Sequence, residues 1–90
     1  MKTIWKYELE TLDLFGLDMP CGAEVLTVQM QNGKPCLWVL VDPSKYKENR
    51  TFAIHGTGHG VSNAENKKYI GTYQLMGGEL VFHLFELRDS

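Results

Sequence analysis

The chain has 90 residues, of which 43% are hydrophobic and 22% are charged, with a formal net charge of −2. This length and composition predict a single globular domain over residues 1–90 with a modest core. The slightly acidic balance argues against the basic surface expected of a protein that binds a nucleic-acid polymer. No run of about 20 apolar residues is present, so no membrane-spanning helix is expected.

The first residues and the cysteines predict a location inside a cell. Residues 1–6 lack the apolar core of a secretory signal peptide. The two cysteines, Cys21 and Cys36, fit reduced thiols better than a disulfide framework. We therefore expect a cytoplasmic protein.

Turn signals divide the N-terminal third into short strands. Residues 2–9 alternate, which places Trp5, Tyr7 and Leu9 on one face of a strand. A second strand is expected over residues 12–17. It should end at a turn over residues 19–22, where proline and glycine occur together.

The pair Asn32-Gly33 predicts a two-residue β-hairpin turn. The hairpin should have an apolar core face and a mixed outer face. The core face would pair Met30 with Pro35, Val28 with Leu37 and Leu26 with Val39. The outer face would pair Gln29 with Cys36, Thr27 with Trp38 and Val25 with Leu40. A mixed face carrying a tryptophan is typical of contact with a ligand or another subunit, although a covering loop or short helix explains it equally well.

The C-terminal half predicts one further strand, two segments with a helical turn and a second hairpin. Residues 43–49 are polar and fit a turn of helix, while residues 50–54 resume a strand. Ser62 and Glu65 have capping-box spacing, which predicts one or two helical turns over residues 62–68. The turn at 76–79 should form the second hairpin. Its expected pairs are Leu75 with Leu80, Gln74 with Val81, Tyr73 with Phe82, Thr72 with His83, Gly71 with Leu84, and Ile70 with Phe85.

These elements predict a mainly β fold, namely a small antiparallel sandwich or barrel of six to seven strands with at most one short helix. Apolar or mixed residues occupy both sheet faces, which favours self-association. We therefore expect a homo-oligomer, most simply a dimer.

The stretch His55-Gly56-Thr57-Gly58-His59-Gly60 is the strongest functional signal in the chain. Glycines at this density allow positive φ angles and close approach of the backbone to a ligand. Successive N–H groups would then form a nest that binds a phosphate or carboxylate, with a histidine donating a further hydrogen bond. The alternative interpretation is a tight solvated turn without function.

Other residues extend this prediction to a nucleotide-like ligand. Trp38 and Tyr69 are candidates for contact with a base or ribose, because an aromatic face stacks on a base. Basic residues flank the glycine loop in the sequence and would form a positive rim; they are Lys45, Lys47, Arg50, Lys67 and Lys68.

Metal binding and catalysis are not expected. Zinc sites need three or four ligands, and here only His55 and His59 lie close in sequence. Thr57 between two histidines lacks any known nucleophile motif around it. His83 lies on a strand, where a histidine is usually structural. The sequence therefore predicts no metal site, no cofactor and no catalytic residue.

The chain resembles a family of small proteins of similar length, encoded by tailed phages and prophages, to which no activity is assigned. The resemblance covers nearly the whole chain, and its most distinctive element is Gly56-Thr57-Gly58-His59. Members often have proline after that histidine, where this chain has Gly60. The other matching segments are Ile4-Trp5-Lys6-Tyr7, Met19-Pro20-Cys21-Gly22-Ala23, Val28-Gln29, Gly33-Lys34-Pro35-Cys36-Leu37-Trp38, Val41-Asp42-Pro43, Tyr69-Ile70-Gly71-Thr72, Gly78 and Leu80-Val81-Phe82-His83.

The resemblance implies a phage-encoded protein that acts in the host cytoplasm. Together with the loop, it predicts a non-catalytic protein that sequesters a small phosphorylated ligand, such as a cyclic nucleotide or an ADP-ribose-type defence signal. The alternative function is a protein-interaction module that inhibits a host factor or serves the virion, using the face around Trp38. A small phosphodiesterase is the third hypothesis.

Overall fold

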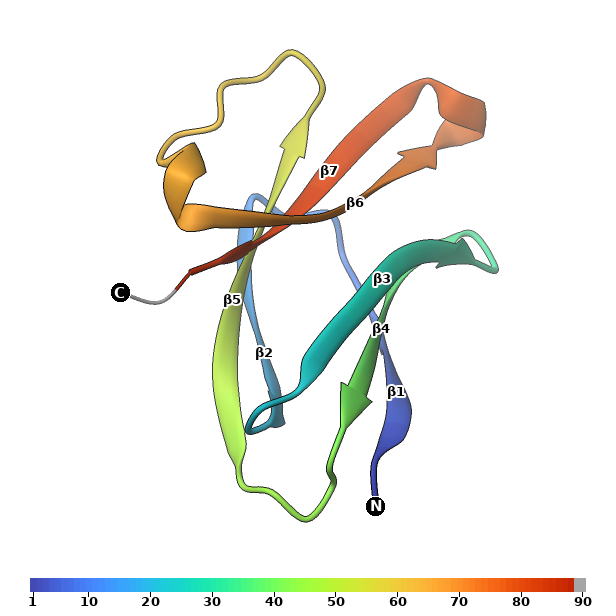
Figure 1. Cartoon of the computed structure of the whole chain (residues 1–90). Coiled ribbons are helices and arrows are strands. Elements are labelled where there is room, and N and C mark those ends of the chain that lie inside the picture. Colours follow the sequence, from blue (N-terminus) through green and yellow to red (C-terminus); the bar gives the residue numbers. More distant parts are fainter. Residues whose placement is uncertain (89–90) are drawn as a thin grey trace.

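A computed structural model describes residues 1–88 as seven strands in two antiparallel sheets (Figure 1). One sheet has the strand order β1-β4-β3, and the other has the order β2-β5-β7-β6. The predicted mainly β fold is confirmed. The strands are β1 (Thr3–Glu8), β2 (Leu14–Pro20), β3 (Glu24–Gln31), β4 (Lys34–Val41), β5 (Lys47–Gly56), β6 (Lys67–Leu75) and β7 (Leu80–Leu87); two single 3₁₀ turns are η1 (Ala64–Asn66) and η2 (Met76–Gly78).

The core lies between the two sheets and follows the period-2 alternation of the strands. From β4, the side chains of Leu37, Val39 and Val41 point inward and have no exposed surface. From the other sheet, Phe52 on β5 and Leu84 on β7 are equally buried. The Phe52 ring also stacks on Phe15, with 5.7 Å between ring centroids.

The Asn32-Gly33 hairpin is confirmed between β3 and β4. Both turn residues have positive φ, at 52° and 80°, as a two-residue turn of this type requires. The predicted pairing holds from Met30 opposite Pro35 to Thr27 opposite Trp38. Beyond that point the prediction is wrong, because a bulge at Leu26 shifts the register. Val25 therefore lies opposite Val39, and Leu26 is 43% exposed.

The second hairpin, between β6 and β7, is confirmed in the same way. The predicted pairs hold from Leu75 opposite Leu80 to Gly71 opposite Leu84, and they include Thr72 opposite His83. A bulge at Ile70 then places Tyr69, rather than Ile70, opposite Phe85. The expected Ile70–Phe85 pair is therefore wrong.

Three predicted element boundaries are also wrong. Strand β2 runs from Leu14 to Pro20, and the turn is limited to Cys21 and Gly22, because buried Met19 and Pro20 are paired with the start of β5. Strand β5 begins at Lys47, so residues 47–49 are extended. The helix over residues 62–68 is reduced to η1, whose cap residue Asn63 has a left-handed conformation and caps no N–H with its side chain.

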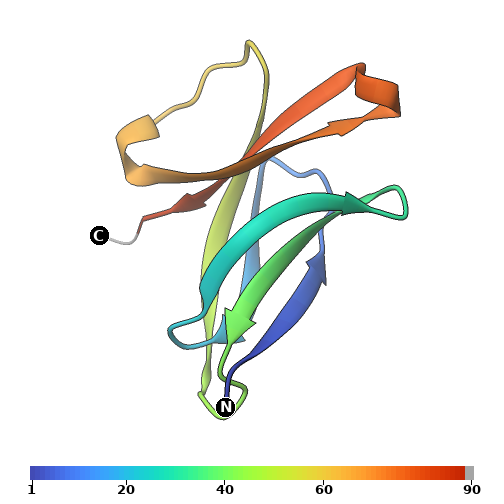
Figure 2. The ribbon, with the colours of Figure 1, turned by 45° about the vertical axis from the view of Figure 1, so that its right-hand side comes forward.

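The two sheets approach each other most closely where β3 runs beneath β6 (Figure 2). At this point Gly71 on β6 lies against Val28 on β3, and a Cβ added at Gly71 would be 2.8 Å from Val28 Cγ1. On the opposite side, the Tyr7 hydroxyl on β1 donates a hydrogen bond to the Asp18 carbonyl on β2 (3.1 Å). Among residues 1–88, no helix is long and apolar enough to cross a membrane.

Candidate ligand-binding site

The glycine-histidine loop continues directly from the end of β5. The N–H of Thr57 donates to the carbonyl of Val81 on β7 (3.2 Å), and the N–H of His59 donates to the carbonyl of Gly56 (3.1 Å). Within the described chain, the N–H groups of Gly58 and Gly60 have no backbone acceptor. The loop therefore offers alternate N–H groups to a ligand, and not the run of successive ones that the sequence predicts.

Two of the loop glycines occupy positions that disfavour a residue with a Cβ. Gly58 has a φ of 86°, a region that side chains with a Cβ rarely adopt. Gly56 lies under the His59 ring, because a Cβ at Gly56 would be 3.0 Å from His59 Nδ1. Gly60 has neither feature, and a Cβ there would meet open space. Gly56 and Gly58 thus fix the position of the His59 ring.

The loop separates two hollows on the surface. The larger has a volume of about 370 Å³ and lies between the loop and the segment that precedes β2. The smaller, of about 250 Å³, lies on the β7 side. His59, Gly56 and Phe82 line both. The larger hollow is also lined by Thr11, Leu12, Asp13, Ile54, His55 and Gly60, and the smaller by Thr57, Glu79, Leu80 and Val81.

His55 lines the larger hollow and contacts Lys67. Lys67 Nζ lies 3.3 Å from His55 Nε2 and also donates to the Ser62 carbonyl at 2.7 Å. Because an ammonium group only donates, the Nε2 of His55 accepts and the imidazole is neutral in this contact. Burial and the Lys67 charge lower the pKa of His55; Asp13 opposes them, while His59 and His83 add to the lowering.

Removing the Lys67 charge should raise the pKa of His55. The lowered pKa means that the folded protein takes up a proton at His55 less readily than the unfolded chain. At pH values above the ordinary pKa of histidine, the neutral His55 imidazole therefore contributes to stability. That contribution is lost as the pH falls through the folded-state pKa of His55. In Lys67→Met, the pKa of His55 should rise but stay below 6.5, because burial is the larger cause.

An NMR titration of the His55 ring protons measures this pKa directly. Lys68→Met is the matched control, because Lys68 is adjacent in sequence and is not among the causes of the shift. An unchanged His55 titration in Lys67→Met would contradict the assigned contact.

A chain of hydroxyl groups and one imidazole crosses the outer face of the same sheet. The Tyr69 hydroxyl lies 2.5 Å from Thr72 Oγ1, which lies 2.8 Å from His83 Nδ1. His83 Nε2 is 2.6 Å from Thr57 Oγ1 in the loop. The Phe85 ring packs edge-on against both Tyr69 and His55, with 5.6 Å between ring centroids in each pair. These contacts connect the aromatic candidate Tyr69 to the loop.

The structure brings six of the seven predicted site residues to one end and one outer face of the β2-β5-β7-β6 sheet. These are His55, Gly56, Thr57, Gly58, His59 and Tyr69. Trp38 is not among them, because it lies on β4 in the other sheet, between Lys6 and Thr27. Its neighbours Leu37 and Val39 point into the core, so Trp38 faces outward on the far side of the molecule.

Sequence reasoning missed several residues of this site. Asp13 and Thr11 come from the segment before β2, and the Thr11 hydroxyl is hydrogen-bonded to the buried Tyr73 phenol (2.8 Å). Burial raises the pKa of Tyr73, which keeps it a neutral partner. The hairpin register did place Thr72 opposite His83. Only the return of the loop to β7 brings Thr57 to that histidine.

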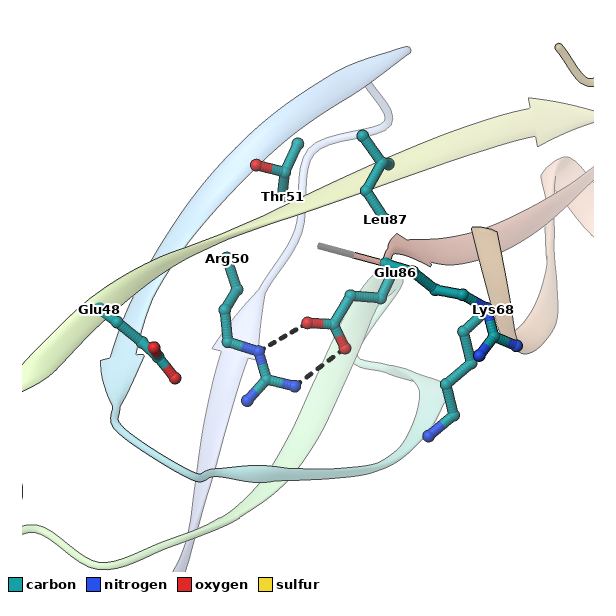
Figure 3. Close-up of a pocket in the computed structure, with 7 residues that line it drawn as sticks. Glu48, Arg50, Thr51, Lys68, Glu86 and Leu87 are labelled. Carbon is teal, nitrogen blue, oxygen red and sulfur yellow. Dashed lines mark hydrogen bonds and ion pairs between the residues drawn. The ribbon is translucent and has the colours of Figure 1, made fainter. Parts of the chain in front are cut away.

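Of the five predicted basic residues, only Lys67 contacts a residue of the loop site. Arg50 and Lys68 instead line a separate pocket of about 220 Å³, shown in Figure 3. There Arg50 forms a two-pronged ion pair with Glu86, with Nε–Oε2 at 2.6 Å and Nη2–Oε1 at 2.9 Å. Lys45 and Lys47 lie near the start of β5, at the opposite end of that strand from the loop.

The whole chain, residues 1–90, matches a family described as a domain of unknown function. It belongs to that family, DUF7352. No curated protein and no solved structure matches the chain. Within residues 1–88, no three His, Cys, Asp or Glu side chains gather as metal ligands.

Proposed function

We propose that the protein binds and sequesters a small phosphorylated ligand, of the cyclic-nucleotide or ADP-ribose type, at the glycine-histidine loop. One observation carries the proposal. Hydrogen-bond donors line two adjoining hollows: the imidazoles of His55 and His59, the Thr57 hydroxyl and the N–H group of Gly60. Phosphate oxygens accept such bonds, and an N–H group in a glycine-rich loop approaches them closely.

The aromatic residues support a ligand larger than phosphate alone. On the outer face of the sheet, the Phe85 ring contacts both His55 and the exposed Tyr69. A base or ribose could pack on these rings while its phosphate occupies a hollow beside the loop. Lys67 adds a positive charge beside His55.

Binding without turnover is favoured by the state of His55. Its Nε2 lone pair faces the Lys67 ammonium group, and its lowered pKa disfavours the protonated form that a general acid needs. We therefore propose that the protein captures its ligand intact and is not an enzyme. No metal, cofactor, nucleic-acid polymer or membrane enters this proposal.

The resemblance to phage proteins supports a role in the host cytoplasm against a defence signal. Self-association, as a dimer or higher oligomer, is part of the same proposal. It is supported by a row of side chains on the outer face of the β2-β5-β7-β6 sheet, in which Leu14 is 61% and Tyr69 is 55% exposed. Light scattering at micromolar concentration measures the mass.

A thermal-shift screen with cyclic di- and trinucleotides, ADP-ribose and inorganic phosphate tests the binding. A ligand at about 100 times its Kd should stabilise the protein by about 2.7 kcal/mol, a shift of several degrees for a domain of this size. Recovery of the ligand unchanged would support sequestration, and recovery of a cleaved product would identify an enzyme instead.

Gly58→Val and Gly22→Val form a matched pair for locating the site. Both glycines have positive φ, 86° and 78°, and a Cβ at either position meets no atom within 4 Å. The substitutions should therefore cause similar backbone strain, at opposite ends of β5. We expect Gly58→Val to lose the ligand-induced shift and Gly22→Val to keep it. Equal shifts in both variants would place the ligand elsewhere.

A protein-interaction module is the second candidate, favoured by the outer face of the β1-β4-β3 sheet. Trp38 lies there beside Lys6, whose Nζ is 6.0 Å from the centre of the indole ring, and Ile4 on the same face is 56% exposed. A host factor held on this face should be lost from pull-down with Trp38→Ala and retained with Gly58→Val.

A further inference from the structure

His83 lies at the middle of the hydroxyl chain and has a hydrogen-bond partner at each ring nitrogen. Thr72 Oγ1 is 2.8 Å from Nδ1, and Thr57 Oγ1 is 2.6 Å from Nε2. A neutral imidazole donates at one nitrogen and accepts at the other, so the direction of the chain depends on the tautomer. The favoured tautomer is the one that places more of the available protons in hydrogen bonds.

The Nε2–H tautomer places every proton of the chain. The Tyr69 hydroxyl donates to Thr72, the Thr72 hydroxyl donates to Nδ1, and Nε2–H donates to Thr57. The Thr57 hydroxyl is then left with the Val81 carbonyl, 3.5 Å away. In the Nδ1–H tautomer, Nδ1–H donates to Thr72 and the Thr57 hydroxyl donates to Nε2. The Thr72 hydroxyl then donates to Tyr69, whose own proton has no acceptor in the chain. Each arrangement has three bonds within the chain, and the first adds the long bond from the Thr57 hydroxyl to the Val81 carbonyl.

The Thr57 hydroxyl is the one donor of the chain with a poor acceptor. A bond of 3.5 Å to Val81 is long for a hydroxyl donor, and that carbonyl already accepts the Thr57 N–H at 3.2 Å. Thr57 and Val81 both line the smaller hollow beside the loop. A ligand oxygen in that hollow would be a better acceptor than the carbonyl. A hydroxyl that itself accepts a short bond from an imidazole N–H is also a stronger donor.

We propose that His83 is a positioning residue for the ligand site. Tyr69 and Thr72 hold its ring as the Nε2–H tautomer, and this ring turns the Thr57 hydroxyl proton toward the hollow, where a phosphate oxygen accepts it. The inference rests on the proposed function, because it assigns the anion to Thr57. It also assigns roles to Thr72 and His83, which need not touch the ligand.

Nitrogen-15 NMR of the His83 ring, without any ligand, tests the assigned tautomer. At pH 8, above the usual range in which imidazole takes up a proton, the directly bonded proton should be on Nε2, and Nδ1 should show the resonance of an unprotonated nitrogen. Thr72→Val removes the donor to Nδ1 and should give a mixture of tautomers. A proton on Nδ1 in the unchanged protein would overturn the proposal.

Titration with inorganic phosphate tests whether this tautomer directs the Thr57 hydroxyl to the anion. The loss of one neutral hydrogen bond is typically about 0.5–1.5 kcal/mol, so Thr72→Val should weaken phosphate binding roughly two- to tenfold. Thr57→Val should weaken it at least as much, and Thr57→Ser should restore it. Thr3→Val, at an exposed threonine at the start of β1 in the other sheet, is the matched control and should bind as the unchanged protein does.

The two proposals fail in different ways. If the unchanged protein binds neither phosphate nor any ligand of the screen, the proposed function fails, and the role of His83 toward a ligand fails with it. If the unchanged protein binds phosphate and Thr72→Val binds it equally well, only the positioning role is overturned. A merely structural role for Thr72 would change stability and leave the tautomer and the affinity as they were.

Discussion

Glu86→Leu should lower the free energy of unfolding by about 2–3 kcal/mol, because it breaks a largely buried ion pair. Arg50 and Glu86 are only 19% and 15% exposed, and both oxygens of the carboxylate are bonded to the guanidinium group (Figure 3). Without Glu86, the Arg50 charge would remain largely buried and would lose both of its bonds to that carboxylate. This penalty exceeds the modest value of an exposed ion pair.

The same arginine also joins the two sheets. Its third nitrogen, Nη1, donates to the carbonyl of Ala23, just before β3. Arg50→Met should therefore be at least as destabilising as Glu86→Leu, because it leaves both a carboxylate and a carbonyl without their partner.

A double variant separates the ion pair from the packing. Arg50→Met with Glu86→Leu removes both charges and should recover most of the loss, except for the bond to Ala23, because a buried pair can be replaced by apolar residues at little cost. Urea unfolding of the four proteins gives the coupling free energy. A double variant no more stable than the single ones would show that the pair itself stabilises the fold.

Gly71→Ala should destabilise the protein by about 1–3 kcal/mol through overpacking. The added Cβ would be 2.8 Å from Val28 Cγ1, and Val28 is a buried residue in the closest approach of β3 to β6. The Val28 side chain is short and branched, so it cannot turn away without disturbing its neighbours. No backbone strain contributes, because Gly71 is not among the residues with positive φ.

A second substitution at the contact tests this explanation. Adding Val28→Ala to Gly71→Ala removes the clashing methyl groups, so the double variant should lose less stability than the sum of the two single changes. Gly60→Ala is the matched control, because its Cβ meets open space. Thermal unfolding of all four variants measures the differences, and additive losses would contradict a clash at this point.

The two hairpins could be predicted because the turns specify them locally. Asn32-Gly33 demands two successive positive φ angles, which places Val28 opposite Leu37. The bulges could not be predicted, because Leu26 and Ile70 are apolar and fit the alternation in either register. Pro20 read as a turn signal, yet it ends a strand at the sheet edge, where a proline needs no ladder partner.

The loop of the candidate site could be predicted for a similar local reason, since its glycines and histidines are consecutive. Its surroundings could not, because they depend on contacts between distant segments. Lys67 reaches His55 from the start of β6, and Thr57 meets His83 only through the pairing of β5 with β7. The aromatic side chain of Trp38 predicts a contact with the ligand, but the strand order places this residue on the other sheet.

The placement of the described chain ends decides how the protein can be handled in binding experiments. The N-terminus lies at the opposite end of the molecule from the loop, as both views show (Figures 1 and 2). Arg88, by contrast, donates its N–H to the Asn66 carbonyl, directly before Lys67. An affinity handle or surface tether fused ahead of Met1 therefore leaves the candidate site open, whereas one fused directly after Arg88 would begin close to the lysine that contacts His55.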